Sequence, residues 1–102
     1  MNERLRGYLG LANRAGKALV GEAINKMWTR KKIFVLIMAN DAHSNTQAKL
    51  AQAAEVDHIL VLRLASKAEL GQALGFAEVS TVAIIDKGLS QAIIDVIKEE
   101  VK

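Results

Sequence analysis

The chain has no cysteine and no proline, and only 4% of its 102 residues are aromatic. Without cysteine it has no disulfide framework, no thiol nucleophile and no thiolate metal site. The scarcity of aromatic side chains argues against a broad stacking platform for nucleic-acid bases. The longest uninterrupted apolar run, residues 33–39, is far shorter than the ~18 residues that a membrane-spanning helix needs. No secretory leader is recognisable either, so we expect a cytoplasmic protein without membrane contact.

The composition fits one folded domain. Hydrophobic residues make up 51% of the chain and charged residues 25%, which argues against intrinsic disorder. A chain of 102 residues can build one hydrophobic core but not two. We therefore expect a single domain over residues 1–102, acting as a monomer. We expect no metal and no cofactor, because the two histidines stand far apart and no glycine-rich phosphate loop is present.

Positive charge is concentrated in the first third of the chain. Residues 1–32 carry eight basic and two acidic residues, whereas residues 33–102 carry six basic and nine acidic residues. This uneven distribution is typical of a small domain that presents one face to a polyanion. The basic residues considered for such a face are Arg14, Lys17, Lys26 and Arg30. Ordinary solvated surface residues would give the same counts, and this alternative stays open here.

Hydrophobic patterning predicts an alternation of helices and strands. Five segments have the apolar spacing or the caps of a helix: residues 3–14, 22–31, 44–54, 66–74 and about 89–101. Four shorter segments are apolar throughout, as in strands buried on both faces: residues 18–20, 33–39, 59–62 and 82–85. This order predicts a three-layer α/β/α sandwich around a mixed, mostly parallel sheet of about four strands.

Two alternatives to a nucleic-acid-binding protein can be drawn from the sequence. Asp41, His43 and Ser44 follow a predicted strand and would be the catalytic group of a small α/β enzyme. Residues that are neighbours in one turn, however, rarely adopt the geometry of a nucleophile, a base and an orienting acid. We therefore expect that the protein is not an enzyme. The other alternative is a protein–protein adaptor in translation or transcription, which would use the acidic helix over residues 95–100.

The most promising binding segment runs from Gly21 to Arg30. Gly21 follows a short strand and lets a ligand approach the backbone closely, and the amides of the next three residues open a helix that favours phosphate. Asn25 offers a donor and an acceptor to base edges, and Lys26 adds positive charge. Glu22 suits a base amino group better than a phosphate. From these residues alone, a capped surface helix with routine charge stays the alternative.

Three stretches of the chain have the order and spacing of a known family. They are residues 9–26 (LGLANRAGKALVGEAINK), residues 37–49 (IMANDA, then SNT, then Lys49) and residues 66–88 (SKAELG, then ALG, ending in DKG). Together they resemble the ribosomal L7Ae family in its bacterial YlxQ-like branch, over nearly the whole chain. The resemblance implies an α/β/α sandwich that binds kink-turn RNA, a sharply bent helix–internal-loop–helix with tandem sheared G·A pairs.

The resemblance also implies which residues contact the RNA. In the family, a Gly-x-Asn-Glu-x-x-Lys-like stretch opening the second helix contacts the guanines and the nearby backbone. It maps here onto Gly21, Glu22, Asn25 and Lys26, although the glutamate precedes the asparagine in this chain.

A second, apolar loop of the family packs against a flipped-out nucleotide. Its counterpart in this chain is the segment Phe76, Ala77, Glu78, Val79 and Ser80. We therefore expect a non-catalytic, ribosome-associated protein whose partner is a kink-turn in ribosomal RNA or a messenger leader. Arg14, Lys17 and Arg30 would add positive charge to its RNA site.

Overall fold

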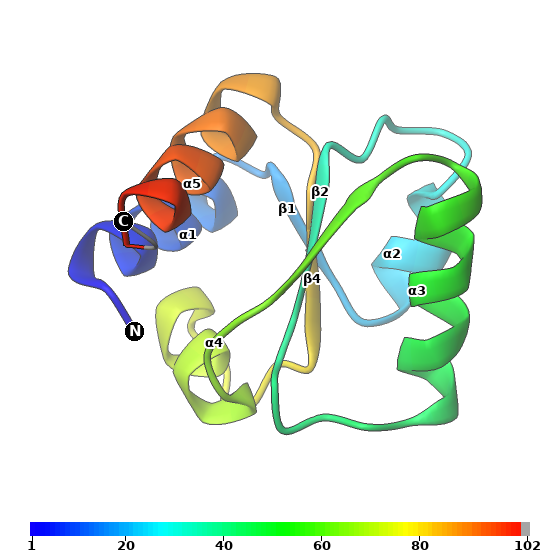
Figure 1. The fold of residues 1–102 in the computed structure, drawn as a ribbon, viewed down its shortest axis with the longest axis horizontal. Helices are drawn as coiled ribbons and strands as arrows, with labels where there is room; N and C mark the ends of the chain where they lie inside the picture. The colour runs from blue at the N-terminus through cyan, green and yellow to red at the C-terminus, as the bar shows by residue number, and fades with distance from the viewer. Residues whose placement is uncertain (101–102) are drawn as a thin grey trace.

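A computed structural model of the protein describes residues 1–100 as one sheet between two layers of helices (Figure 1). The helices are α1 (Glu3–Arg14), α2 (Glu22–Met27), α3 (Asn45–Val56), α4 (Lys67–Leu74) and α5 (Lys87–Glu100). The strands are β1 (Ala18–Val20), β2 (Val35–Met38), β3 (Leu60–Arg63) and β4 (Thr81–Ile84). The predicted alternation is confirmed, with α2 four residues shorter than expected. The expected end of the last helix at Val101 lies outside the described residues.

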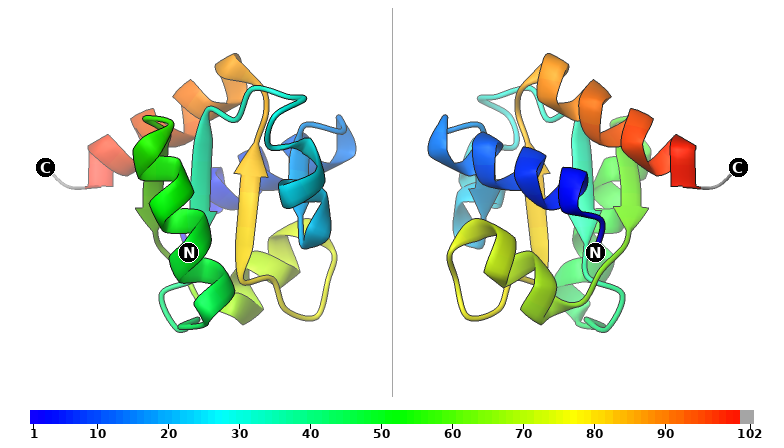
Figure 2. Two further views of the ribbon diagram at one scale, coloured as in Figure 1. Left: turned by 90° about the vertical axis from the view of Figure 1, so that its right-hand side faces the viewer. Right: turned by 90° about the vertical axis from the view of Figure 1, so that its left-hand side faces the viewer.

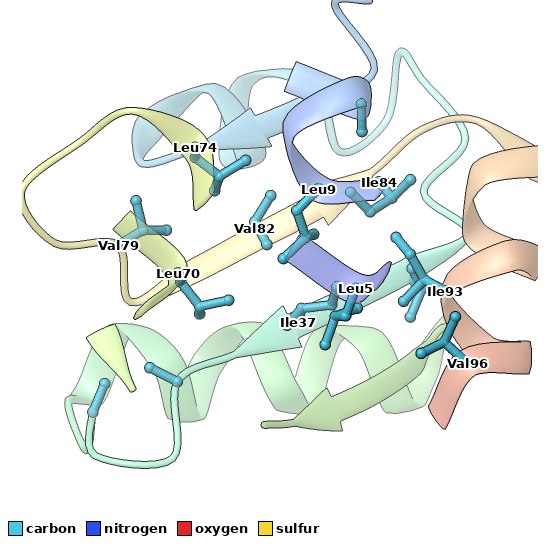
Figure 3. Close-up of a cluster of buried hydrophobic side chains, with 14 residues drawn as sticks. Leu5, Leu9, Ile37, Leu70, Leu74, Val79, Val82, Ile84, Ile93 and Val96 are labelled. Carbon is cyan, nitrogen blue, oxygen red and sulfur yellow. The ribbon is translucent and has the colours of Figure 1, made fainter. Parts of the chain in front are cut away.

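Helices cover both faces of the sheet, which confirms the three-layer sandwich. Helices α1, α4 and α5 pack on one face and α2 and α3 on the other (Figure 2). Ile37 and Ile84 point into the first layer's core (Figure 3), whereas Leu36 and Ala83 belong to the second core. All residues of β2 and β4 are buried, because successive side chains of each strand enter opposite cores. None of the helices over residues 1–100 is long and apolar enough to cross a membrane.

The sheet is mixed, but the expectation that it is mostly parallel is wrong. The strand order is β1-β4-β2-β3, and of the three pairs of neighbouring strands over residues 1–100 only β2–β3 is parallel. Strand β4 lies between β1 and β2 and runs antiparallel to both. A run of apolar residues indicates that a strand is buried on both faces, but it does not indicate the direction of the strand. The pattern therefore could not distinguish parallel from antiparallel pairing. The third predicted strand is also less buried than expected, since β3 is an edge strand and Leu60 is 45% exposed.

The helix ends follow the local sequence. Ser66 and Glu69 form the predicted capping box, with each side chain accepting from the other residue's backbone amide. Ser44 caps α3 by accepting from the amide of Gln47, but the Gln47 side chain does not complete the box. Helix α4 ends at Gly75, whose φ of 85° is a left-handed conformation that favours glycine.

Candidate nucleic-acid interface

Three chain segments meet at one end of the sheet. Val20 at the end of β1 pairs with Val82 of β4, and Met38 at the end of β2 pairs with Thr81. The amide of Ala39 donates to the carbonyl of Ser80 over 2.9 Å. The antiparallel position of β4 therefore places the start of α2, the start of α3 and the segment before β4 beside one another, at the lower end in the left view of Figure 2. We call this end the loop end of the sheet.

Gly21 is exposed at the loop end and has a conformation that suits glycine. Its φ and ψ are 58° and −137°, and no atom beyond its two chain neighbours lies within 4 Å of the position that a Cβ would take. A ligand can therefore approach this backbone without a side chain in the way. The expectation of three free amides after Gly21 is wrong for the third one. The amide of Ile24 donates to the Gly21 carbonyl over 3.2 Å, as in a tightened first turn.

The polar residues predicted on α2 are exposed, and two of them face α3. Glu22 and Asn25 line a hollow of about 300 Å³ between α2, α3 and the start of β4. The opposite wall of this hollow contains Ser44, Thr46, Gln47, Ser80 and Thr81. Lys26 is exposed in the last turn of α2 and makes no ion pair within residues 1–100. The hollow offers backbone and side-chain hydrogen-bonding groups, next to one cation.

Gln47 is a buried polar residue of this hollow and is not among the predicted site residues. It is 2% exposed, and its Nε2 donates to the carbonyl of Ser80 (2.7 Å) and to Oγ1 of Thr81 (3.1 Å). Its Oε1 is buried and has no partner within the described residues. Its burial could have been predicted from its spacing, because Gln47 is three residues before Leu50 and seven before Ala54 and so lies on the buried face of α3.

The segment over residues 76–80 packs directly against α4. A Cβ on Gly71 would lie 2.8 Å from the carbonyl oxygens of Phe76 and Ala77, so only glycine allows this approach. Phe76 is 49% exposed, while Val79 is 6% exposed and belongs to the core of the first layer. Glu78 is exposed and lies 3.9 Å from the ammonium group of Lys67.

A second hollow joins this segment to the start of α2. It measures about 210 Å³, and its lining residues are Val20, Gly21, Phe76, Glu78, Val79, Ser80 and Thr81. The structure therefore brings together the two segments that the resemblance connected, although Gly21 and Phe76 stand far apart in the sequence.

The basic residues Arg14, Lys17 and Arg30 do not join this cluster. The carbonyl of Lys17 accepts from Ile85, beyond the far end of β4. Arg30 follows the end of α2, so it lies outside the helix that carries Lys26. Arg14 lies in the last turn of α1, on the other face of the sheet. Charge counted along the chain could not show that β1 separates Lys17 from the loop end, or that α2 ends before Arg30.

The proposed catalytic group is not assembled. The carboxylate of Asp41 accepts from the amide of Lys67 over 2.9 Å, and the Ser44 hydroxyl accepts from the amide of Gln47 over 3.2 Å. Both groups therefore stabilise helix starts, and His43 is exposed with no hydrogen bond to either.

The acidic helix proposed for an adaptor is partly occupied by internal contacts. Glu99 forms an ion pair with Arg4 over 2.5 Å, and Asp95 accepts from Gln91 over 2.9 Å. These contacts leave fewer free carboxylates on α5 than the sequence suggests.

Comparison with known proteins relates this arrangement to an RNA-binding family. Two proteins named RNA-binding protein YlxQ, from Enterococcus faecium and Bacillus subtilis (strain 168), are each 30% identical to this chain over 90 residues. The matches cover 87% of this chain in both cases, and 86% and 90% of the two relatives.

Solved structures show the same architecture. A protein of unknown function from Bacillus halodurans C has a TM-score of 0.86 and 28% identity, covering 95% of this chain and 99% of that chain. The 15.5kD RNA binding protein of Giardia lamblia has a TM-score of 0.71 and 19% identity, covering 97% of this chain and 89% of its own, and shares the fold.

The resemblance seen in the sequence is confirmed by a family model as well as by these relatives. That model matches residues 3–94, which include every helix and strand from α1 to β4 and most of α5. The chain belongs to the ribosomal protein L7Ae/L30e/S12e/Gadd45 family.

Proposed function

We propose that this protein binds structured RNA and has no catalytic role, and that its target is a kink-turn of the ribosome or of a messenger leader. The main support is the position of Gly21 beside residues 76–80 at the loop end, where Gly21 and every residue of that segment except the buried Val79 are exposed. The names of the two YlxQ relatives add support for RNA as the ligand.

In this proposal the residues at the start of α2 contact the RNA bases, and Lys26 positions the RNA backbone. Glu22 and Asn25 supply an acceptor and an amide to base edges, while the open backbone at Gly21 allows close approach. Lys26 neutralises a phosphate. Phe76 supplies an exposed apolar surface for an unstacked base, which is how structured RNA is commonly recognised.

The test is a titration with a short kink-turn RNA and with the same RNA whose tandem G·A pairs are changed to Watson–Crick pairs. We expect a strong preference for the kinked RNA. Lys26→Glu should weaken its binding by about tenfold or more, because one phosphate contact becomes a repulsion. Lys98→Glu on α5 makes the same charge change away from the loop end and should leave the affinity nearly unchanged.

Equal, weak and salt-sensitive binding to both RNAs would contradict kink-turn recognition and would favour the adaptor function. Unchanged binding by Lys26→Glu, with the preference for the kinked RNA intact, would remove this residue from the site.

A further inference from the structure

Five basic side chains gather at the end of the sheet opposite the loop end. They are Lys17, Arg30, Lys31, Lys32 and Lys87, and all five are exposed. We call this group the basic edge. It includes two of the residues that charge counting had assigned to the predicted RNA site.

Backbone hydrogen bonds fix the position of this edge. The carbonyl of Lys17 accepts from Ile85 over 2.9 Å, and Phe34 donates to Ile84 over 2.9 Å. These bonds place the turn before β1 and the loop before β2 at the end of β4. Helix α5 starts three residues after the end of β4, at Lys87. In the left view of Figure 2 these segments lie at the upper end, away from the loops that precede α3 and β4.

The positive charge of the basic edge is not neutralised internally. None of its five side chains forms an ion pair within residues 1–100. Asp57 accepts from the indole of Trp28 (2.6 Å) and Asp86 accepts from the amide of Leu89 (2.8 Å), and within residues 1–100 neither carboxylate lies within 4.0 Å of a basic side-chain nitrogen. Uncompensated like charges repel one another and attract an anionic partner.

We propose that the basic edge binds the phosphate backbone of a second RNA segment, so that the protein holds two RNA segments at opposite ends of its sheet. This proposal rests on the proposed RNA-binding function. Lys17 and Gly21 stand at the two ends of β1, which separates their Cα atoms by about 13 Å at the rise of an extended strand. One phosphate cannot therefore contact both ends.

The chemistry of the basic edge predicts contacts to phosphates rather than to bases. Lysine is a point charge without a planar fork, and four of the five residues are lysines. The ammonium group of Lys32 lies 5.3 Å from the centre of the Phe34 ring, an arrangement that holds this charge at the surface. We therefore expect the edge to bind an RNA duplex of any sequence, weakly and with a strong dependence on salt.

The test saturates the loop end with a minimal kink-turn RNA and then titrates a labelled plain RNA duplex. The wild-type complex should bind the duplex without releasing the kink-turn RNA. The triple variant K17E/K31E/K32E should lose about tenfold or more of the duplex affinity, and its salt dependence should flatten. Its affinity for the kink-turn RNA should change by no more than about twofold, which also shows that the variant is folded.

Single variants provide the matched control. Lys31→Glu and Lys98→Glu change the net charge equally, but only Lys31 belongs to the basic edge. Duplex that displaces the kink-turn RNA would overturn the proposal, and so would equal duplex binding by wild type and triple variant. Either result would leave the kink-turn proposal standing, because that proposal fails only if the kinked RNA is not preferred.

Discussion

The side-chain amide of Gln47 donates to the backbone carbonyl of Ser80 over 2.7 Å, and it joins the first turn of α3 to the residue that precedes β4. The same nitrogen donates to Oγ1 of Thr81 over 3.1 Å. Both segments line the hollow beside Asn25. Gln47 therefore fixes the start of α3 against the start of β4, and both segments line the proposed RNA site. The Gln47 side chain itself is buried.

Replacing Gln47 with leucine should loosen these walls. Gln47→Leu removes the donor and leaves Thr81 Oγ1 without this partner, so we expect the free energy of unfolding to fall by about 1–2 kcal/mol. Urea unfolding measures this loss. Kink-turn affinity measured where the variant is fully folded should fall too. A variant as stable as wild type would show that the hydrogen bonds contribute no net stability.

Gly21→Ala should reduce stability and RNA binding together. Alanine is strained at a φ of 58°, and we expect a loss of about 1–2 kcal/mol in the free energy of unfolding. Gly16→Ala is a matched control, because Gly16 also has a positive φ and open space but lies at the other end of β1. Gly16→Ala should be destabilised yet retain kink-turn affinity. Equal affinities for the two variants would contradict a close backbone contact at Gly21.

Gly71→Ala should displace the segment over residues 76–80. The added Cβ would meet the carbonyl oxygens of Phe76 and Ala77 at 2.8 Å, and both are backbone atoms that cannot rotate away. We expect a loss of about 1–3 kcal/mol, typical of overpacking. Gly7→Ala is the comparison, since a Cβ on Gly7 would meet no atom within 4 Å beyond the backbone of α1 itself, and alanine should stabilise that helix by about 0.5–1 kcal/mol. Chemical unfolding should show a lower free energy of unfolding for Gly71→Ala and a higher one for Gly7→Ala. This difference in sign would confirm the close approach at Gly71.

The contribution of Glu69 to the stability of the fold should depend on pH. Hydrogen bonds from the Met1 amino group and from the Ser66 backbone lower the pKa of the Glu69 carboxyl below its ordinary value. A lowered pKa in the folded state means that the stabilisation is present above the ordinary value of about 4.3 and is lost as the pH falls below it. The difference in Tm between wild type and Glu69→Gln should therefore shrink on acidification. A difference that stays constant between neutral and acidic pH would contradict a role of the charge.

The order of the elements could be predicted because each one has its own local signal. Ser66 and Glu69 mark one helix start, and Gly75 marks the end of the same helix. The direction of β4 had no such signal. It depends on which strands it joins, and the run of buried residues from Thr81 to Ile84 suits either direction.

The residues of the candidate site could be predicted to lie together where they are close in the sequence. They could not be predicted where folding brings distant residues together or carries neighbours apart. Gly21, Glu22 and Asn25 do lie at one hollow, as their spacing suggested. Lys17 is only four positions before Gly21, yet an extended strand carries it to the other end of the sheet. Gln47 was missed because its partners, Ser80 and Thr81, are supplied by a strand late in the chain.

The pairing of β1 with β4 also determines when the hollow beside Gly21 is complete. Gly21 and Ser80 are separated by about sixty positions, so their hollow exists only after β4 has inserted between β1 and β2. A nascent chain that ends before β4 carries all the residues of α2 but has no second wall beside them. In the proposed function, an RNA bound at this hollow would stabilise the complete sheet rather than one helix, because only the folded sheet forms both sides of the hollow.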